Sequence, residues 1–240
     1  MRKIVAIINL TLDGVMQAPG RPDEDTRGGF KYGGWAGPYF DPVMGKVMRE
    51  GMAKAPVLLL GRRTYEDFYA VWPNRTDNLF TEVLDNAEKY VASRTLDGPL
   101  PWINSTLLKG EASLTVAALK EQPGKDLVIL GCGDLVQSLM RRNLIDEYTL
   151  SIHPLVLGSG RRLFPDGIPF AALQLVDSKT TTIGVVIATY RPVDLTVSKT
   201  SCSFNPRDKR IGFHYFLKTF TKSYNHCDEN FLLVNNPCLS

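Results

Sequence analysis

Arginine, hydroxyl and glycine residues gather at three places where an apolar run gives way to a polar segment. These junctions are GRRT at residues 61–64, SRT at 93–95 and GCG at 131–133. Guanidinium groups bind phosphate oxygens in pairs, and small residues at a helix start leave backbone N–H groups open to an anion. A dinucleotide with an additional 2′-phosphate needs both kinds of group. The three junctions therefore predict a nucleotide site.

Each junction also has a purely structural interpretation when it is considered alone. The glycine turn at 131–133 lacks the third glycine of the G-x-G-x-x-G fingerprint, and no acidic ribose partner follows a strand about 20 residues later. It could be a tight corner needed only for packing. Arg62 and Arg63 could be a solvated pair at a helix start, and residues 93–95 could be a surface tripeptide.

Two aspartates and one tryptophan are further candidates. Asp13 precedes Gly14, which is typical of a turn, but a hydride acceptor needs a proton donor nearby. Asp13 is therefore a candidate for proton donation or for substrate hydrogen bonding. Asp41 precedes Pro42, which is typical of a helix cap, and is a second candidate substrate ligand. Trp35 could wall a substrate pocket, although packing is the more common role of a tryptophan.

The composition restricts the class of protein. The chain has 240 residues, 44% of them hydrophobic, and a formal net charge of +3. These values are typical of a soluble globular protein and are too weakly basic to predict a nucleic-acid partner. No apolar stretch approaches the roughly 20 residues that cross a bilayer, so no membrane partner is expected. The four cysteines show no C-x-x-C pairing, so we expect no metal, no disulfide framework and a cytoplasmic location.

Strands and helices alternate along residues 1–192, which predicts an α/β domain with a mainly parallel sheet and helices on both faces. Apolar and β-branched runs predict strands at 3–9, 55–61, 89–96, 101–108, 126–130 and 145–157. Capping residues and apolar spacing predict helices at 42–54, 62–72, 113–122 and 133–144. The remaining segments are expected to be a long loop at 11–40 and an antiparallel hairpin at 170–192, turning at 177–182. Ligands of such sheets bind outside the carboxyl ends of the strands, where the three junctions lie.

The composition changes after residue 192. Residues 193–240 hold three of the four cysteines, no alanine and one glycine, and neither strand alternation nor a helical stripe persists there. We expect an appendage outside the core. It could be a disordered tail, a partner-binding tail, or sequence from a shifted or extended reading frame.

Several stretches, in order, resemble the dihydrofolate reductase superfamily, and most closely the RibD C-terminal domain family of riboflavin-biosynthesis reductases. They are NLTLDG at 9–14, LLLGRRTYE at 58–66, VASRTL at 91–96, the block at 128–164, and the final hairpin. The block at 128–164 is the most specific, and the tail lies outside the resemblance. The resemblance implies a dihydrofolate reductase-like three-layer α/β/α fold with an antiparallel C-terminal hairpin.

The resemblance also implies a cytoplasmic, NADPH-dependent reductase that is often a homodimer. The residues that would bind NADPH are Leu10, Gly61, Arg62, Arg63, Thr64, Ser93, Arg94, Gly131, Gly133, Asp134 and Leu135. Ser93 and Arg94 would bind the 2′-phosphate, residues 131–135 would line the pyrophosphate, and Leu10 would flank the nicotinamide. Asp13 would lie near the reacting centre.

The implied reaction is hydride transfer from NADPH to a small heterocyclic or carbonyl/imine acceptor. Members of the riboflavin branch reduce 5-amino-6-(5-phosphoribosylamino)uracil, usually beside a deaminase domain. No H-x-E with P-C-x-x-C occurs in this chain, so we expect no zinc deaminase here. Dihydrofolate reduction is an alternative, although Asp41 lies only at the edge of the helix that carries the folate reductases' carboxylate. A nucleotide-binding module without turnover is another alternative.

Overall fold

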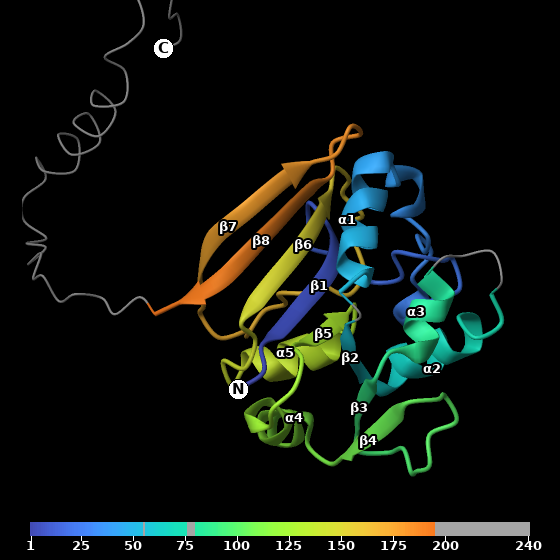
Figure 1. The fold of residues 1–240 in the computed structure, drawn as a ribbon. Coiled ribbons are helices and arrows are strands. Elements are labelled where there is room, and N and C mark those ends of the chain that lie inside the picture. Colours follow the sequence, from blue (N-terminus) through green and yellow to red (C-terminus); the bar gives the residue numbers. More distant parts are fainter. Residues whose placement is uncertain (55, 76–79, 195–240) are drawn as a thin grey trace, which may run out of the picture. The chain divides into compact units, whose positions relative to one another are not determined.

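The computed structural model describes residues 1–54, 56–75 and 80–194, which contain an eight-stranded sheet (Figure 1). The strands are β1 (Ile4–Thr11), β2 (Val57–Gly61), β3 (Lys89–Ser93), β4 (Ser105–Lys109), β5 (Leu127–Leu130), β6 (Glu147–His153), β7 (Ala172–Thr180) and β8 (Val186–Val193). Their spatial order is β4-β3-β2-β5-β1-β6-β8-β7. The first six strands in this order are parallel, whereas β8 runs antiparallel to both β6 and β7. The predicted mainly parallel sheet with an antiparallel hairpin is confirmed.

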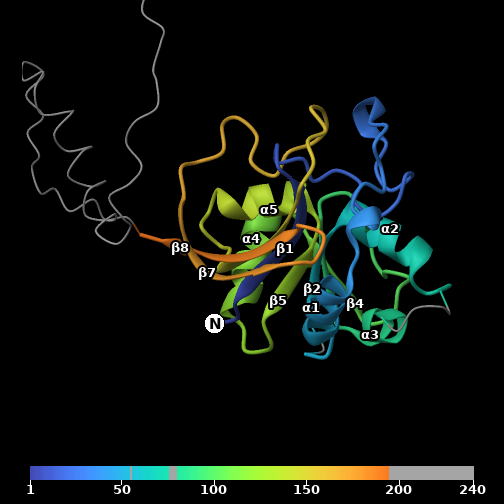
Figure 2. The same cartoon turned by 90° about the horizontal axis from the view of Figure 1, so that it is seen from above.

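Helices cover both faces of this sheet, as a three-layer fold requires (Figure 2). They are α1 (Pro42–Met52), α2 (Arg62–Val71), α3 (Phe80–Asn86), α4 (Ala112–Glu121) and α5 (Gly133–Met140). In Figure 2, α4 and α5 lie on one side of the sheet and α1 lies on the other. Between β1 and α1, residues 12–41 form the predicted long loop, which contains only two short 3₁₀ turns.

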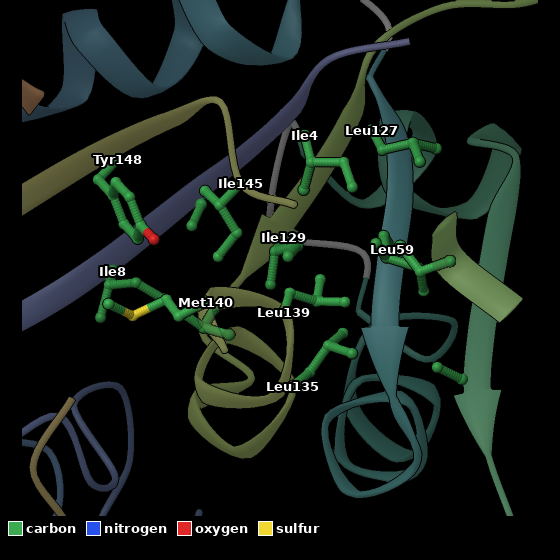
Figure 3. Close-up of a cluster of buried hydrophobic side chains, with 14 of the residues drawn as sticks. Ile4, Ile8, Leu59, Leu127, Ile129, Leu135, Leu139, Met140, Ile145 and Tyr148 are labelled. Atoms are coloured by element: carbon green, nitrogen blue, oxygen red, sulfur yellow. The ribbon is translucent and has the colours of Figure 1, made fainter. Parts of the chain in front are cut away.

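The larger core lies between the sheet and α5 (Figure 3). Leu135, Leu139 and Met140 recur at helical spacing, so they form one apolar face on α5. They point toward Ile8 and Ile129 of neighbouring strands (Figure 3). Full burial of one such side chain contributes about 1.5–3 kcal/mol. This packing fixes where α5 begins, and therefore where the glycine turn before it lies.

A second core lies on the opposite face of the sheet. Leu58 and Leu60 of β2 are fully buried there against Tyr65 of α2, Leu84 of α3 and Trp102. The sequence of β2, VLLLG, explains this burial, because its successive apolar side chains point to opposite faces of the sheet. The start of α2 is therefore held against the carboxyl end of β2.

Several predicted boundaries differ from the structure. Helix α3 was not predicted, and the expected helices at 42–54 and 133–144 end earlier, at Met52 and Met140. The strand expected at 101–108 begins only at Ser105, because the backbone N–H of Trp102 instead donates to the Tyr65 hydroxyl at 3.0 Å. The hairpin turns at 181–185 instead of 177–182. The tail predicted for 193–240 lies outside the described residues, apart from its first two.

Candidate active site

A cleft of about 1950 Å³ runs along the sheet face that α1 and α2 flank. It reaches the carboxyl ends of β2, β3 and β5, where the three predicted junctions lie. Every residue predicted to bind the cofactor lines this cleft except Leu10, which is buried in the core. Its volume exceeds the roughly 300–1000 Å³ of most ligand pockets, because it extends along most of this face of the sheet.

The N-termini of α2 and α5 open onto the cleft without a side-chain cap. Their first backbone N–H groups therefore lack the usual side-chain acceptor, and the helix dipole makes both ends attractive to an anion. The turn before α5 carries Gly131 at φ +68° and Cys132 at φ +53°. Two successive left-handed residues turn the backbone sharply between β5 and α5. The predicted glycine turn is therefore present at the start of α5.

The Cys132 thiol joins two of the predicted junctions. Its Sγ accepts a hydrogen bond from the Gly61 N–H at 3.4 Å, and the thiol donates to the Leu130 carbonyl at 3.4 Å. Burial raises the pKa of Cys132, although hydrogen bonds from Thr64 and Gly61 oppose that rise. The thiol therefore stays protonated near neutral pH, so its geometry is that of a packing residue and not of a nucleophile.

Ser93 and Arg94 lie at the carboxyl end of β3, beside the same cleft. Ser93 is buried, and its Oγ accepts hydrogen bonds from the N–H groups of Thr95 at 3.1 Å and Leu96 at 3.0 Å. Those two bonds do not use its hydroxyl proton. Arg94 is exposed, and it forms no hydrogen bond or ion pair with any other residue in the described ranges. Both side chains can donate to a phosphate that enters the cleft.

Asp134, in the first turn of α5, brings together three guanidinium groups. Its carboxylate lies 3.3 Å from Arg63 Nη1 and 3.7 Å from Arg27 Nη1, and it pairs with Arg161 as well. Arg27 and Arg161 also line the cleft, and our sequence prediction missed both. The sequence signal for these two arginines is weak, because neither lies where a strand gives way to a helix.

Asp13 forms part of a turn and holds a second loop in place. Its carboxylate accepts hydrogen bonds from the Thr11 hydroxyl at 2.5 Å, Gly158 N–H at 2.9 Å and Leu157 N–H at 3.3 Å. Burial acts to raise the pKa of Asp13, but these hydrogen bonds together hold it below its usual value. The turn interpretation is supported, and the group is a poor proton donor near neutral pH. Its catalytic role stays a prediction.

The two candidate substrate residues are engaged by the protein itself. The Asp41 carboxylate accepts from Met44 N–H at 2.8 Å and from the N–H and hydroxyl of Thr182, each at 2.7 Å. It is therefore the helix cap that the sequence suggested. The Trp35 indole N–H donates to the Gln17 carbonyl at 2.7 Å, and its ring packs edge-on against His153. Neither Asp41 nor Trp35 lines the cleft, so substrate binding by them stays a prediction.

Glu24 is a cleft-lining acid that our sequence analysis missed. Burial raises its pKa, although the N–H groups of Gly20 and Arg21 donate to its carboxylate at 2.7 and 3.2 Å. A carboxyl group of this kind keeps its proton to a higher pH than Asp13 does. No sequence motif marks it, because its environment arises only from the folding of the long loop.

The described ranges contain neither a candidate metal cluster nor a candidate membrane-spanning helix. No group of three or more His, Cys, Asp and Glu side chains there is arranged to hold a metal ion. None of the helices in those ranges is long and apolar enough to span a membrane.

Comparisons with known proteins place the chain in a family. The model of a family described as the RibD C-terminal domain matches residues 2–188. An uncharacterized Bacillus subtilis protein, YyaP, is 30% identical over 197 residues, which cover 79% of this chain and 94% of YyaP. Two solved structures show the same fold. The first is described as a putative riboflavin biosynthesis protein from Shewanella sp. PV-4; it is 18% identical with a TM-score of 0.53, and the match covers 80% of this chain and 99% of that one. The second is a pyrimidine reductase-like protein from Corynebacterium diphtheriae; it is 11% identical with a TM-score of 0.55, and the match covers 80% of this chain and 92% of that one. This chain belongs to the RibD C-terminal domain family.

Proposed function

We propose that the protein is an NADPH-dependent reductase that delivers hydride to a small heterocyclic or carbonyl/imine acceptor. Membership of the RibD C-terminal domain family supports a reductase-type function. One observation carries the cofactor assignment. A single cleft is lined by the uncapped N-termini of α2 and α5 and by the Ser93-Arg94 pair at the end of β3.

The residues around this cleft fit the parts of NADPH, which would supply the hydride when bound. The N–H groups at the start of α5, with Arg63 beside them, suit a pyrophosphate. Arg94 and Ser93 suit the 2′-phosphate, because Arg94 is exposed and Ser93 retains a hydroxyl proton. The protein would bind and orient the cofactor and exclude water from the acceptor.

Reduction of a C=N or C=O group also needs a proton for the heteroatom. Asp13 suits this need poorly, because its hydrogen bonds stabilise the ionised carboxylate. Its role would be to hold the 157–158 loop in place. Glu24 suits the need better, because its raised pKa keeps it protonated to a higher pH and because it lines the cleft.

The acceptor that we would test first is 5-amino-6-(5-phosphoribosylamino)uracil. Its support comes from the family and from the structural relatives described as riboflavin biosynthesis and pyrimidine reductase-like proteins. Dihydrofolate is the weaker candidate, since Asp41 already accepts hydrogen bonds from Met44 and Thr182. The proposal includes a cytoplasmic homodimer, which rests on the family resemblance alone.

A fluorescence titration with NADPH and with NADH tests the cofactor assignment. Wild-type protein is expected to bind NADPH more tightly than NADH. Arg94→Ala should weaken NADPH binding by about 10- to 100-fold and leave NADH binding unchanged, because it removes a charge-assisted phosphate contact. Arg142→Ala, an exposed arginine outside the cleft, is the matched control.

The outcomes of this titration are distinct. A folded wild-type protein that binds neither nucleotide would contradict the reductase proposal at its first step. Equal losses of NADPH and NADH binding in Arg94→Ala would contradict the 2′-phosphate assignment only. If NADPH binds, its oxidation with a panel of pyrimidine, pterin and imine acceptors identifies the substrate class. Binding without oxidation of NADPH by any acceptor would favour a nucleotide-binding module without turnover.

A further inference from the structure

We propose that Asp134 is an internal competitor for the phosphates of the nucleotide, and that it lowers the affinity of the cleft for any pyrophosphate-containing ligand. This inference rests on the proposed function, since it takes the nucleotide to bind at the N-terminus of α5. The Asp134 carboxylate already lies at this helix end and pairs with the arginines that would bind the phosphates.

The position of Asp134 is the first reason. It is the second residue of α5, directly after Gly133, in a first turn that has no side-chain cap. A bound phosphate would lie at this helix end, within a few residues of the carboxylate. Like charges so close repel each other, and the repulsion is strongest when solvent is displaced.

The second reason is the origin of the three arginines that surround Asp134. Arg63 comes from α2, Arg27 from the long loop, and Arg161 from the loop after β6. Segments far apart in the sequence thus supply guanidinium groups to one point at the cleft. Each arginine offers a planar pair of donors that matches phosphate oxygens.

The charges do not balance around this point. Arg27 also pairs with Asp25, so three guanidinium groups face two carboxylates, Asp25 and Asp134. The local excess is positive and attracts an anion. A ligand phosphate can replace Asp134 as the partner of these arginines, but it must break the existing ion pairs to do so.

The third reason is the position of Met16. A methyl group at residue 133 would lie 2.1 Å from Met16 Cε, so this side chain of the long loop covers the glycine turn. The same loop carries Arg27, which pairs with Asp134. The ion pair thus helps hold the loop over the place where the phosphate must bind. Neutralising Asp134 removes both the competing charge and this restraint.

The test is Asp134→Asn, titrated with NADPH, NADH and inorganic pyrophosphate. We expect all three to bind about fivefold more tightly than to the wild type, because the removed repulsion acts on groups that all three share. The gain should shrink at about 0.5 M salt, since the ion pairs are half exposed and therefore screened. Glu121→Gln, which removes a charge from the exposed end of α4 outside the cleft, should change nothing.

Each outcome bears on one of the two proposals. Weaker or unchanged binding by Asp134→Asn, with a wild-type melting temperature, would overturn the competitor role and leave the reductase proposal standing. A gain for NADPH alone would also overturn it, because the 2′-phosphate would then be the group that Asp134 repels. Wild-type protein that binds none of the three ligands would overturn both proposals.

Discussion

Helices α1 and α5 both begin beside an aspartate, but the two carboxylates differ in almost every physical respect. Asp41 precedes α1, is only 6% exposed, and accepts hydrogen bonds from Met44 and Thr182. Asp134 lies inside the first turn of α5, its side chain is 51% exposed, and its partners are arginines. The first carboxylate completes a helix end, whereas the second leaves that end uncapped.

This difference separates acids that are held by backbone N–H groups from acids that are held by arginine side chains. A buried carboxylate whose acceptor sites are filled by backbone N–H groups cannot easily change partners, because each donor that it leaves would be unsatisfied. Arginines around an exposed carboxylate can exchange that carboxylate for another anion at little cost. By this criterion Asp13 and Glu24 both belong with Asp41, because backbone N–H groups donate to their carboxylates.

The largest expected effect is the loss of stability in Asp41→Ala. This substitution leaves the N–H groups of Met44 and Thr182 without their acceptor and releases α1 from the hairpin turn. We expect the melting temperature to fall by about 5–10 °C, as measured by calorimetry. Asp134→Ala is the matched comparison and should change it by no more than about 2 °C. Equal losses in the two variants would break the distinction between the two helix ends.

The acid sensitivity of the fold sharpens the same distinction. The Met44 N–H and the Thr182 donors lower the pKa of Asp41, so its contribution to stability is present above the unfolded pKa. That contribution is lost as the pH falls through the lower, folded pKa. Asp41→Asn should therefore flatten the acid limb of a melting-temperature profile below the unfolded pKa of about 3.9. An unchanged limb would show that Asp41 is not a major acid-sensitive group.

A smaller set of effects separates Asp13 from Glu24 once an acceptor is known. Glu24→Gln should lower kcat by about 10- to 100-fold and abolish the fall of kcat at high pH, because the raised pKa suits a proton donor. In Asp13→Asn, kcat should still fall at high pH. The melting temperature should drop by about 2–4 °C, because the Gly158 N–H loses the oxygen to which it donates. The reverse pattern in the pH–rate profiles would assign the proton to Asp13.

The last expected effect concerns a buried cation, Lys89. Its Nζ donates to the carbonyls of Asp85, Ala87 and Ile103, and burial lowers its pKa to about 8. Above pH 8 the unfolded chain binds more protons than the folded one, so this group makes stability rise with pH up to its unfolded pKa of about 10.4. The free energy of unfolding of Lys89→Met, measured with urea, should not show this rise between pH 8 and about pH 10. If the wild type and Lys89→Met showed the same dependence of stability on pH, the lowered pKa of Lys89 would be contradicted.

The sequence alone determined the fold class and the order of most of its elements. The apolar runs of β2 and β5 and the helical spacing of Leu135 and Leu139 are local patterns, so they predicted strands and helices in the right order. Since parallel strands carry their carboxyl ends to one edge, the three junctions could be expected together. Helix α3 was missed because it has only seven residues, and its stability comes from tertiary packing of Leu84 near Trp102.

Only the tertiary structure decided what the individual acids and arginines do. Asp41 is separated from Thr182 by 141 positions and Asp13 from Gly158 by 145 positions. Arg161 is 27 positions from Asp134 and lies on another loop. No local pattern encodes such pairs, because hydrogen bonds and pKa shifts depend on distance and burial in the folded chain. The sequence could therefore propose Asp13, Asp41 and Asp134 as candidates and suggest the cap at Asp41, but it could not identify the distant partners of these carboxylates.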